Sequence, residues 1–176
     1  MLKLNLGCWN RRLEGWINID KVYQPGVDVV EDARYLRSFQ DGSVDTIYAS
    51  HILDLFSRWE YPTVLKRWHT LLKPGGELYI STPDFESIVI RFEDTDDITE
   101  LIGLLHGGQD HEGWIRSMSW TFKSLFNDLR TAGFRGVRRY NWQDTEFASR
   151  DDYSQAYLPH RNPAGILMSL NVVAVK

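Results

Sequence analysis

Short apolar runs alternate with polar or glycine-containing breaks along the chain, a pattern typical of an α/β protein. In 61–72, apolar residues recur at every third and fourth position, which predicts a helix with one apolar face. Strands are predicted at 2–6, 16–19, 27–31, 44–49, 77–81, 134–140 and 166–175, and helices at 61–72, 85–92, 98–105 and 119–132. The order of these elements predicts a wound sheet, which binds ligands beyond the carboxyl ends of its strands.

The connections between the first strands are unusually short. Parallel strands usually need a dozen or more residues between them, mostly helical. Fewer residues separate Gly7 from Trp16, and fewer still separate Asp20 from Val27. We therefore expect single helical turns or bare loops there, which would leave one face of the sheet thinly covered and open to a homodimer interface.

Several predicted strands end in residues suited to a nucleotide-type cofactor. Gly7 ends the first strand, where the missing side chain lets backbone N–H groups approach a ligand closely. Asp20 follows the second strand, where a carboxylate can accept hydrogen bonds from both hydroxyls of a ribose. The alternative is a plain strand and turn, with Asp20 as a surface residue.

Composition narrows the class of protein. The 176 residues fit a single domain, 1–176, with inserts near 94–116 and 141–165. The net charge of −4 comes without a long basic run, so nucleic acid is not an expected partner. The single cysteine, Cys8, excludes an internal disulfide and a cysteine zinc site. No apolar stretch approaches membrane-spanning length and no secretory leader opens the sequence, so we expect a cytoplasmic protein.

Three segments resemble the class I S-adenosylmethionine-dependent methyltransferases, especially small ones that begin LNLGCG and continue GWINVD. The segments are LNLGC with GWINID in 4–20, DGSVDTIYASHILDLF in 41–56 and LLKPGGELYISTPDF in 71–85. In the second segment, Asp54 and Leu55 replace a glutamate and a histidine of the family pattern. The resemblance implies a Rossmann-like, doubly wound and mostly parallel seven-stranded sheet with an antiparallel last strand. It also implies S-adenosyl-L-methionine as the cofactor.

The resemblance also implies which residues bind the cofactor. They are Asn5, Leu6, Gly7, Cys8, Trp9, Asp20, Asp32, Ala33 and Ser50. Asp32 and Ala33 match the position that borders the adenine, although Asp32 equally suits the N-cap of a turn over 34–39. The second and third glycines of the family motif are replaced by Trp9 and Arg11. Trp9 must therefore swing outward or cover the cofactor.

Three histidines are candidates for a catalytic base, namely His51, His111 and His160. His51 follows a central strand, where it would orient the cofactor, take a proton from the acceptor, or simply bond to backbone at a helix start. The segment 106–114 holds two histidines and several acids or amides, but its spacing matches no metal site. We expect no metal and interpret it as a mobile acceptor loop, in which Trp114, like Trp9, is a candidate to stack on a sugar or ring.

The residues past the strand at 77–81 leave two roles open for Asp84, which either helps to bind the acceptor or caps the next helix. The function that these patterns favour is methyl transfer from S-adenosylmethionine to a small molecule or saccharide. The alternative is a degenerate, non-catalytic protein that binds S-adenosylmethionine or a partner through the same fold. A nicotinamide dehydrogenase is disfavoured, because Gly7 lacks the two later glycines of its pyrophosphate turn.

Overall fold

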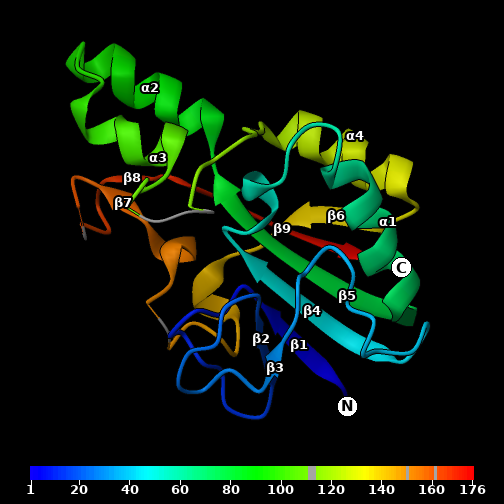
Figure 1. The fold of residues 1–176 in the computed structure, drawn as a ribbon. Coiled ribbons are helices and arrows are strands. Elements are labelled where there is room, and N and C mark those ends of the chain that lie inside the picture. Colours follow the sequence, from blue (N-terminus) through cyan, green and yellow to red (C-terminus); the bar gives the residue numbers. More distant parts are fainter. Residues whose placement is uncertain (111–113, 150, 161) are drawn as a thin grey trace.

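A seven-stranded sheet forms the centre of the computed structural model, which describes residues 1–110, 114–149, 151–160 and 162–176 (Figure 1). The strands are β1 (Lys3–Leu6), β2 (Ile17–Asp20), β3 (Val29–Val30), β4 (Val44–Ser50), β5 (Leu72–Pro83), β6 (Arg135–Arg139) and β9 (Ser169–Val175). Their order is β3-β2-β1-β4-β5-β9-β6, and β9 runs antiparallel to β5 and β6 while the other pairs are parallel. The predicted Rossmann-like sheet with an antiparallel last strand is therefore confirmed.

Helices α1 (Tyr61–Leu71) and α4 (Phe122–Ala132) cover one face of this sheet (Figure 1). Their apolar residues join the main core, in which Trp68 and Leu125 are fully enclosed with Leu6, Ile47 and Ile80 of the strands. Helix α4 begins later than the predicted 119, since Thr121 forms a capping box with Ser124. The periodic pattern thus identified both helices, and the cap set where α4 begins.

The loop between β1 and β2 contains no helix, and Asn18 holds it in place instead. The buried Asn18 side chain accepts hydrogen bonds from Asn5 Nδ2 at 2.9 Å and from the backbone N–H of Leu13 at 2.8 Å. Its own amide donates to the backbone oxygens of Leu13 and Trp16. One amide side chain therefore satisfies backbone groups that a crossover helix would otherwise pair internally.

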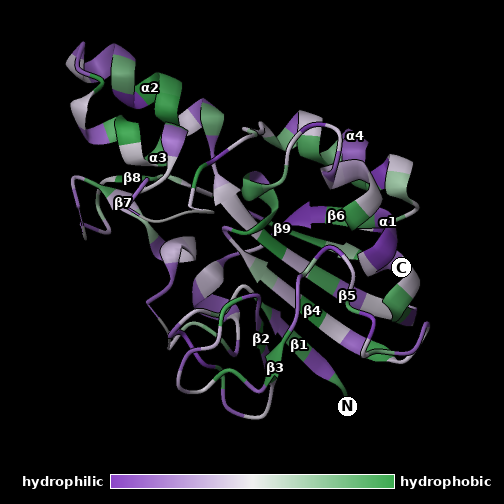
Figure 2. Cartoon of the chain, viewed as in Figure 1, coloured by the Kyte–Doolittle hydropathy of each residue, from purple (hydrophilic) through white to green (hydrophobic). Residues whose placement is uncertain are grey.

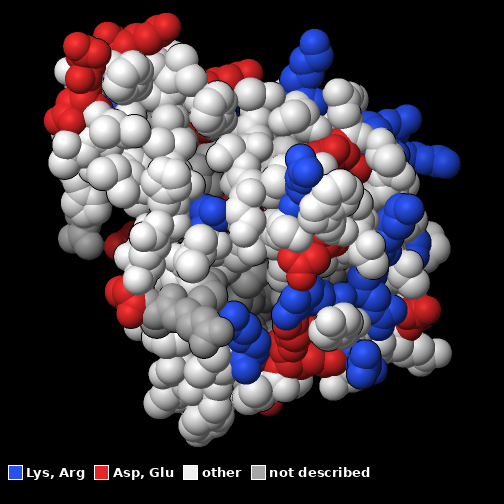
Figure 3. All heavy atoms as spheres, turned by 45° about the horizontal axis from the view of Figure 1, so that its top comes forward, with Lys and Arg blue, Asp and Glu red and all other residues white. Residues whose placement is uncertain are grey.

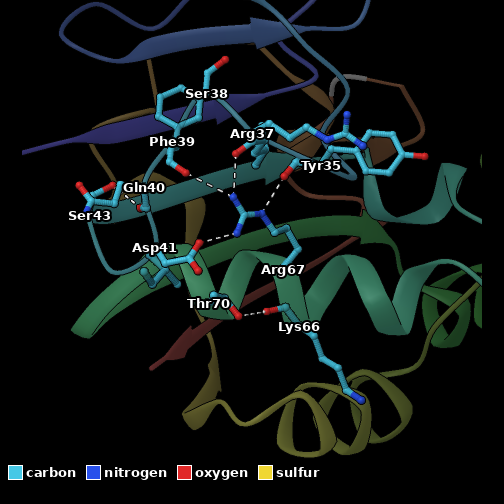
Figure 4. Close-up of polar contacts among 12 residues, drawn as sticks. Tyr35, Arg37, Ser38, Phe39, Gln40, Asp41, Ser43, Lys66, Arg67 and Thr70 are labelled. Carbon is cyan, nitrogen blue, oxygen red and sulfur yellow. Dashed lines mark hydrogen bonds and ion pairs between the residues drawn. The ribbon is translucent and has the colours of Figure 1, made fainter.

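The connection between β3 and β4 is also a bare loop, and Arg67 of α1 holds it (Figure 4). The guanidinium donates to the backbone oxygens of Tyr35 at 2.7 Å, Leu36 at 2.9 Å and Phe39 at 3.3 Å. It also forms an ion pair of 2.6 Å with Asp41. A single planar cation therefore replaces a missing helix as the support for this crossover.

Among the described residues, no α-helix lies on the opposite face of the sheet, and the segment after β6 covers part of it. Phe147 stacks on Tyr48 of β4, with ring centroids 4.0 Å apart, and packs edge-on against Trp16 and Tyr79. Tyr48 also donates a hydrogen bond to the carboxylate of Asp152. The thinly covered face expected from the short crossovers is thus shielded by the insert at 141–165, and a homodimer there stays a prediction.

Helices α2 (Phe85–Thr95) and α3 (Ile102–His106) form an arm beside the sheet, together with strands β7 (Tyr157–Leu158) and β8 (Ile166–Leu167) (Figure 1). Asp84 caps α2 by accepting from the N–H of Glu86 at 3.1 Å, so the capping role is confirmed. Ile88, Leu101 and Met168 form the small core of the arm, whose apolar residues are visible in Figure 2. The arm is therefore a second packing unit attached to the main core.

Two predictions for this region needed correction. The strand predicted at 166–175 is interrupted at Met168, because the N–H of Met168 donates to Ala156 while its carbonyl accepts from the N–H of Asp84. The helix predicted at 98–105 is split into a 3₁₀ turn, Thr99–Leu101, followed by α3. The break at Met168 arises from contacts with distant residues that the local pattern does not encode.

Charge is unevenly distributed over the surface. Figure 3 shows acidic side chains gathered at the end of the α2–α3 arm and basic side chains on the side of α1 and α4. Exposed acidic residues of the arm are Glu93, Asp94, Asp96, Asp97 and Glu100, and exposed basic residues include Lys66, Lys123 and Arg130. In the part of the chain that the structure describes, no helix has the length and apolar character needed to cross a membrane.

Candidate active site

A cavity of about 600 Å³ opens at the carboxyl ends of β1, β2 and β4. Ligand sites of proteins commonly have volumes of about 300 to 1,000 Å³. All nine residues predicted to bind the cofactor line it, namely Asn5, Leu6, Gly7, Cys8, Trp9, Asp20, Asp32, Ala33 and Ser50. Of the predicted bases, His51 lines it as well. The structure therefore gathers these residues around one space, and their roles there stay predictions.

Gly7 turns the chain at the end of β1 in a left-handed conformation, with φ of 63°. A Cβ added to Gly7 would collide with the side chain of Ile52. Both facts require glycine, because an L side chain is strained at this φ and has no room here. The backbone can therefore approach a ligand in the cavity closely.

Asp20 lies at the end of β2 and is only 9% exposed, yet it lines the cavity. Its Oδ2 accepts a hydrogen bond from the N–H of Trp9 at 2.8 Å, and its Oδ1 accepts from the N–H of Val22 at 3.0 Å. Each carboxylate oxygen can accept a second hydrogen bond. Asp20 thus shapes the loop after β1 and keeps acceptor capacity for a pair of hydroxyls.

Trp9 adopts a left-handed backbone with φ of 45°, the conformation that a glycine would adopt freely. The hydrogen bond to Asp20 stabilises this strained backbone from one side. Its side chain is 41% exposed at the rim of the cavity. The replacement of a motif glycine by tryptophan has therefore kept the backbone shape of the turn.

Cys8 is buried beneath this turn and contributes no charge to the cavity. Burial, followed by the negative charges of Asp20 and Asp28, raises the pKa of its thiol to about 12. The backbone N–H of Cys8 donates to the carbonyl of Ile19 at 3.1 Å. The thiol therefore stays protonated and acts as a small apolar side chain.

Asp32 follows β3 and binds Arg34 through both of its carboxylate oxygens. Its Oδ1 also accepts from the N–H of Arg34 at 2.9 Å, which confirms that Asp32 caps the turn. Burial raises the pKa of Asp32, but the hydrogen bonds from Arg34 outweigh burial and lower it. Arg34 also forms an ion pair of 2.7 Å with Glu60. Asp32 is thus an ionised carboxylate at the cavity wall, and its contact with adenine stays a prediction.

Ser50 and Ala33 also line the cavity. Ser50 Oγ is buried and has no hydrogen-bond partner within the described residues. A buried hydroxyl without a partner is costly, so it is well suited to a ligand that supplies one. Ala33 is fixed through its carbonyl, which accepts from Trp68 Nε1 at 2.8 Å.

His51 is held on both nitrogens of its ring. Arg116 Nη1 lies 3.3 Å from Nδ1, and Ser169 Oγ lies 3.2 Å from Nε2. A guanidinium can only donate, so Nδ1 accepts and Nε2 carries the proton. Burial and then the charge of Arg116 hold the pKa of His51 well below its usual range. His51 is therefore neutral with both nitrogens engaged, an arrangement that favours positioning over proton transfer, and its role as a base stays a prediction.

Arg116 forms a buried ion pair with Asp54, a contact that the sequence did not reveal. The Arg116 side chain is 4% exposed and that of Asp54 is fully buried. The Asp54 carbonyl also accepts from the N–H groups of Ser117 and Met118. Asp54 thus joins the first insert to the end of β4 next to His51. The only signal in the sequence was an acid three residues after His51.

Of the other two predicted bases, the structure describes only His160. His160 is exposed in the loop after β7 and does not line the cavity. His111 lies outside the described residues. In the described ranges, no group of three His, Cys, Asp or Glu side chains is placed to hold a metal ion.

The far wall of the cavity comes from both inserts. The first insert contributes Trp114 and Ile115 to this wall, and Ser117 follows directly after it. The second insert contributes Asp152 and Tyr153. The rings of Trp114 and Tyr153 have centroids 6.2 Å apart, and Tyr153 packs against His51 at 5.6 Å. Segments far apart in the sequence therefore build this wall of the cavity.

Comparison with known proteins agrees with this geometry. Residues 15–80 match the family described as a methyltransferase domain. Among curated protein sequences, none matches the chain. The family match over 15–80 and the fold agree with the resemblance to class I S-adenosylmethionine-dependent methyltransferases that the sequence shows.

Solved structures show the same fold at low sequence identity. A SAM-dependent methyltransferase from Archaeoglobus fulgidus has a TM-score of 0.61 and 17% identity over 99% of this chain and 85% of its own. The 1,6-didemethyltoxoflavin-N1-methyltransferase of Burkholderia thailandensis, solved with S-adenosylhomocysteine, has a TM-score of 0.62 and 17% identity over 99% and 70%. A SAM-dependent methyltransferase from Methanosarcina mazei has a TM-score of 0.59 and 16% identity over 99% and 91%. These neighbours show that the chain has the fold of these methyltransferases.

Proposed function

We propose that this chain is an active methyltransferase that transfers a methyl group from S-adenosylmethionine to a small-molecule or saccharide acceptor. The observation that carries the proposal is the pairing of Gly7 and Asp20 at one edge of the cavity, one giving close backbone approach and the other a carboxylate with free acceptor capacity. The methyltransferase family match and the fold support it.

The residues present fit the cofactor. Asp20 would accept from the ribose hydroxyls, and Asp32 with Ala33 would border the adenine. Ser50 Oγ, buried and without a partner within the described residues, would gain one from the ligand. When bound, S-adenosylmethionine supplies a methyl group on a positively charged sulfur, ready for in-line displacement by a nucleophile.

The chain itself would orient the two reactants and exclude water from the space between them. His51, fixed by Arg116 and Ser169, presents a neutral ring edge beside the end of β4. Trp114 and Tyr153 form an aromatic wall next to it. Positioning of two reactants in such an enclosure supplies a large part of the rate in a displacement reaction. No residue is needed to generate the electrophile.

The non-catalytic alternative rests on Trp9 and Arg11, which replace two motif glycines. The left-handed backbone of Trp9 argues against it, because the turn keeps the shape that a glycine would give. The cytoplasmic location and the absence of nucleic acid as a partner remain predictions.

Calorimetric titration with S-adenosylmethionine and S-adenosylhomocysteine tests the proposal. Binding of both ligands, followed by methyl transfer to at least one member of a broad acceptor panel, is the expected result. If the protein binds neither ligand, both the methyltransferase proposal and the non-catalytic alternative are contradicted. Binding without transfer to any acceptor would favour the non-catalytic protein.

A further inference from the structure

The wall formed by the two inserts contains a buried carboxylate, Asp152, which is only 7% exposed and lines the cavity. Its Oδ2 accepts from the Tyr48 hydroxyl, and its Oδ1 accepts from the N–H of Ser154 at 3.0 Å. Burial raises the pKa of Tyr48 well above its usual range, so Tyr48 stays protonated and donates. Tyr48 is therefore the donor and the Asp152 carboxylate the acceptor in this hydrogen bond.

Asp152 has no cationic counterpart in the described part of the chain. Asp32 is paired with Arg34, and Asp54 with Arg116, whereas Asp20, like Asp152, forms no ion pair with a described residue. No Lys, Arg or His of the described residues forms an ion pair with Asp152. A buried carboxylate without a cation is electrostatically costly, and a cationic ligand in the cavity would offset that cost.

The surroundings of Asp152 are aromatic. Tyr153 follows it directly, and Trp114 contacts the Tyr153 ring. Aromatic faces attract cations and apolar ring systems alike. His51 at this end is neutral because burial, and then the charge of Arg116, disfavour its protonation. The Arg11 guanidinium lies over the Tyr153 ring, 5.3 Å from its centroid, so this end of the cavity combines the Asp152 carboxylate with an aromatic surface that already contacts one cation.

Asp152 lies on the side of the cavity away from the predicted adenosine site. Asp20 and Asp32 follow β2 and β3, whereas Asp152 contacts Tyr48 of β4, and β1 separates β2 from β4 in the sheet. The ribose and adenine positions would therefore leave Asp152 open to a second ligand. This inference rests on the proposed function. We propose that the acceptor is an amine attached to an aromatic or apolar group. Its nitrogen would lie at Asp152, and the aromatic or apolar group would pack against Trp114 and Tyr153.

The carboxylate suits amine methylation chemically. The amine binds as an ammonium and gives one proton to solvent water, which frees its lone pair. That lone pair forms the new N–C bond, the electrons of the broken S–C bond stay on sulfur, and the positive charge moves to nitrogen. Asp152 stabilises the charge that arrives there. A second N–H proton then leaves to water, and the methylated amine is the product.

Matched pairs of amines and alcohols test this assignment on the complete chain. The probes are benzylamine, phenethylamine and tryptamine, each compared with the alcohol of the same skeleton, titrated calorimetrically in the presence of S-adenosylhomocysteine. The wild-type complex is expected to bind at least one amine at least tenfold more tightly than its alcohol. Mass spectrometry with S-adenosylmethionine should then detect the N-methylated product. Equal or tighter binding of the alcohols, or binding of no probe, would overturn the inference.

The variant Asp152→Asn assigns the preference to the carboxylate, since the amide keeps the size of the side chain. The tenfold preference should fall below twofold in Asp152→Asn and persist in Asp151→Asn, the exposed neighbour that does not line this cavity. Affinity for S-adenosylhomocysteine should agree within twofold among all three proteins. A tenfold weaker affinity in Asp152→Asn would show that Asp152 holds the cofactor's own ammonium and would overturn the inference.

The two proposals fail in different ways. If wild-type protein does not bind S-adenosylhomocysteine, the methyltransferase proposal fails and the acceptor assignment falls with it. If the cofactor binds and the alcohols are preferred, only the acceptor assignment fails. The wild-type comparison of amines with alcohols needs no variant, so it decides the question even where Asp152→Asn does not fold.

Discussion

Arg116 donates a hydrogen bond of 3.3 Å from its Nη1 to Nδ1 of His51, and this contact fixes the chemical state of the histidine. The cation beside the ring disfavours a second positive charge, and burial acts in the same direction. Ser169 fixes the opposite nitrogen at 3.2 Å. His51, which the sequence indicated as a candidate base, is therefore held in its neutral form, with Nε2 as a donor, inside a buried hydrogen-bond network.

This arrangement predicts a loss of stability in acid. The pKa of His51 is lowered in the folded protein, so the unfolded chain binds a proton more readily below its ordinary value of 6.5. Above pH 6.5 both states are neutral and His51 contributes no pH dependence. As the pH falls below 6.5, the free energy of unfolding should drop by up to about 1.4 kcal/mol per pH unit.

Urea unfolding at several pH values between 5 and 8 measures this slope. His51→Gln, which does not titrate, should lose less stability in acid than wild type. His160→Gln, altered at an exposed histidine, should follow the wild-type curve. Parallel curves for wild type and His51→Gln would contradict the assignment.

Breaking the Asp54–Arg116 ion pair should destabilise the fold strongly. Asp54→Asn leaves the buried guanidinium without its counter-charge, and we expect a loss of about 3 to 5 kcal/mol in the free energy of unfolding. The double variant Asp54→Leu with Arg116→Met removes both charges and should recover much of that loss. Chemical denaturation compares the two, and equal destabilisation would argue against a paired charge.

Asp20→Ala should weaken the binding of S-adenosylhomocysteine by about 1.5 to 3 kcal/mol, since charged hydrogen bonds to the ribose would be lost. Part of this loss reflects the turn itself, because Asp20 also anchors the N–H groups of Trp9 and Val22. Calorimetric titration gives the affinity. Glu93→Ala, an exposed acid on the α2–α3 arm, serves as the control and should bind normally. Unchanged affinity in Asp20→Ala would refute the ribose role.

Gly7→Ala should reduce cofactor affinity by at least about tenfold, or 1.4 kcal/mol. Gly75 offers a matched control, because it is also left-handed, at φ of 79°, and its Cβ would meet nothing within 4 Å. Both alanine variants should lose about 1 to 2 kcal/mol of stability from the strained backbone. Only Gly7→Ala should lose affinity, since only its methyl group collides with Ile52 beside the cavity. Equal affinities for both variants would exclude close approach of a ligand at Gly7.

Arg67→Ala should lower the free energy of unfolding by about 1 to 3 kcal/mol, because three backbone carbonyls and Asp41 lose their donor. Lys66→Ala changes the preceding, exposed residue of the same helix and should stay within about 0.5 kcal/mol of wild type. Urea denaturation distinguishes the two variants. A neutral Arg67→Ala would mean that the β3–β4 loop is held by other contacts.

The sheet was predictable because its signals are local. Alternating apolar runs gave the strands, the spacing of Trp68 and its neighbours gave α1, and Gly7 and Asp20 marked the ends of β1 and β2. The residues predicted to bind the cofactor came mainly from the family resemblance, and the structure places all nine around one cavity.

The far side of the cavity was not predictable because its contacts join distant segments. Arg116 meets Asp54 across more than sixty positions, and Tyr48 meets Asp152 across more than a hundred. Arg116 and Asp152 do not belong to a periodic pattern of apolar residues, so the sequence around them does not indicate their partners. The coverage of the helix-free face by Phe147 escaped prediction for the same reason, since the segment reads only as a polar loop.

The segment after β6 performs two tasks, since Phe147 seals the bare side of the sheet while Asp152 and Tyr153 border the cavity a few residues later. A substitution at Phe147 should therefore shift the cavity wall, although Phe147 does not line the cavity. The covering of the sheet and the shape of the cavity thus depend on one stretch of the chain.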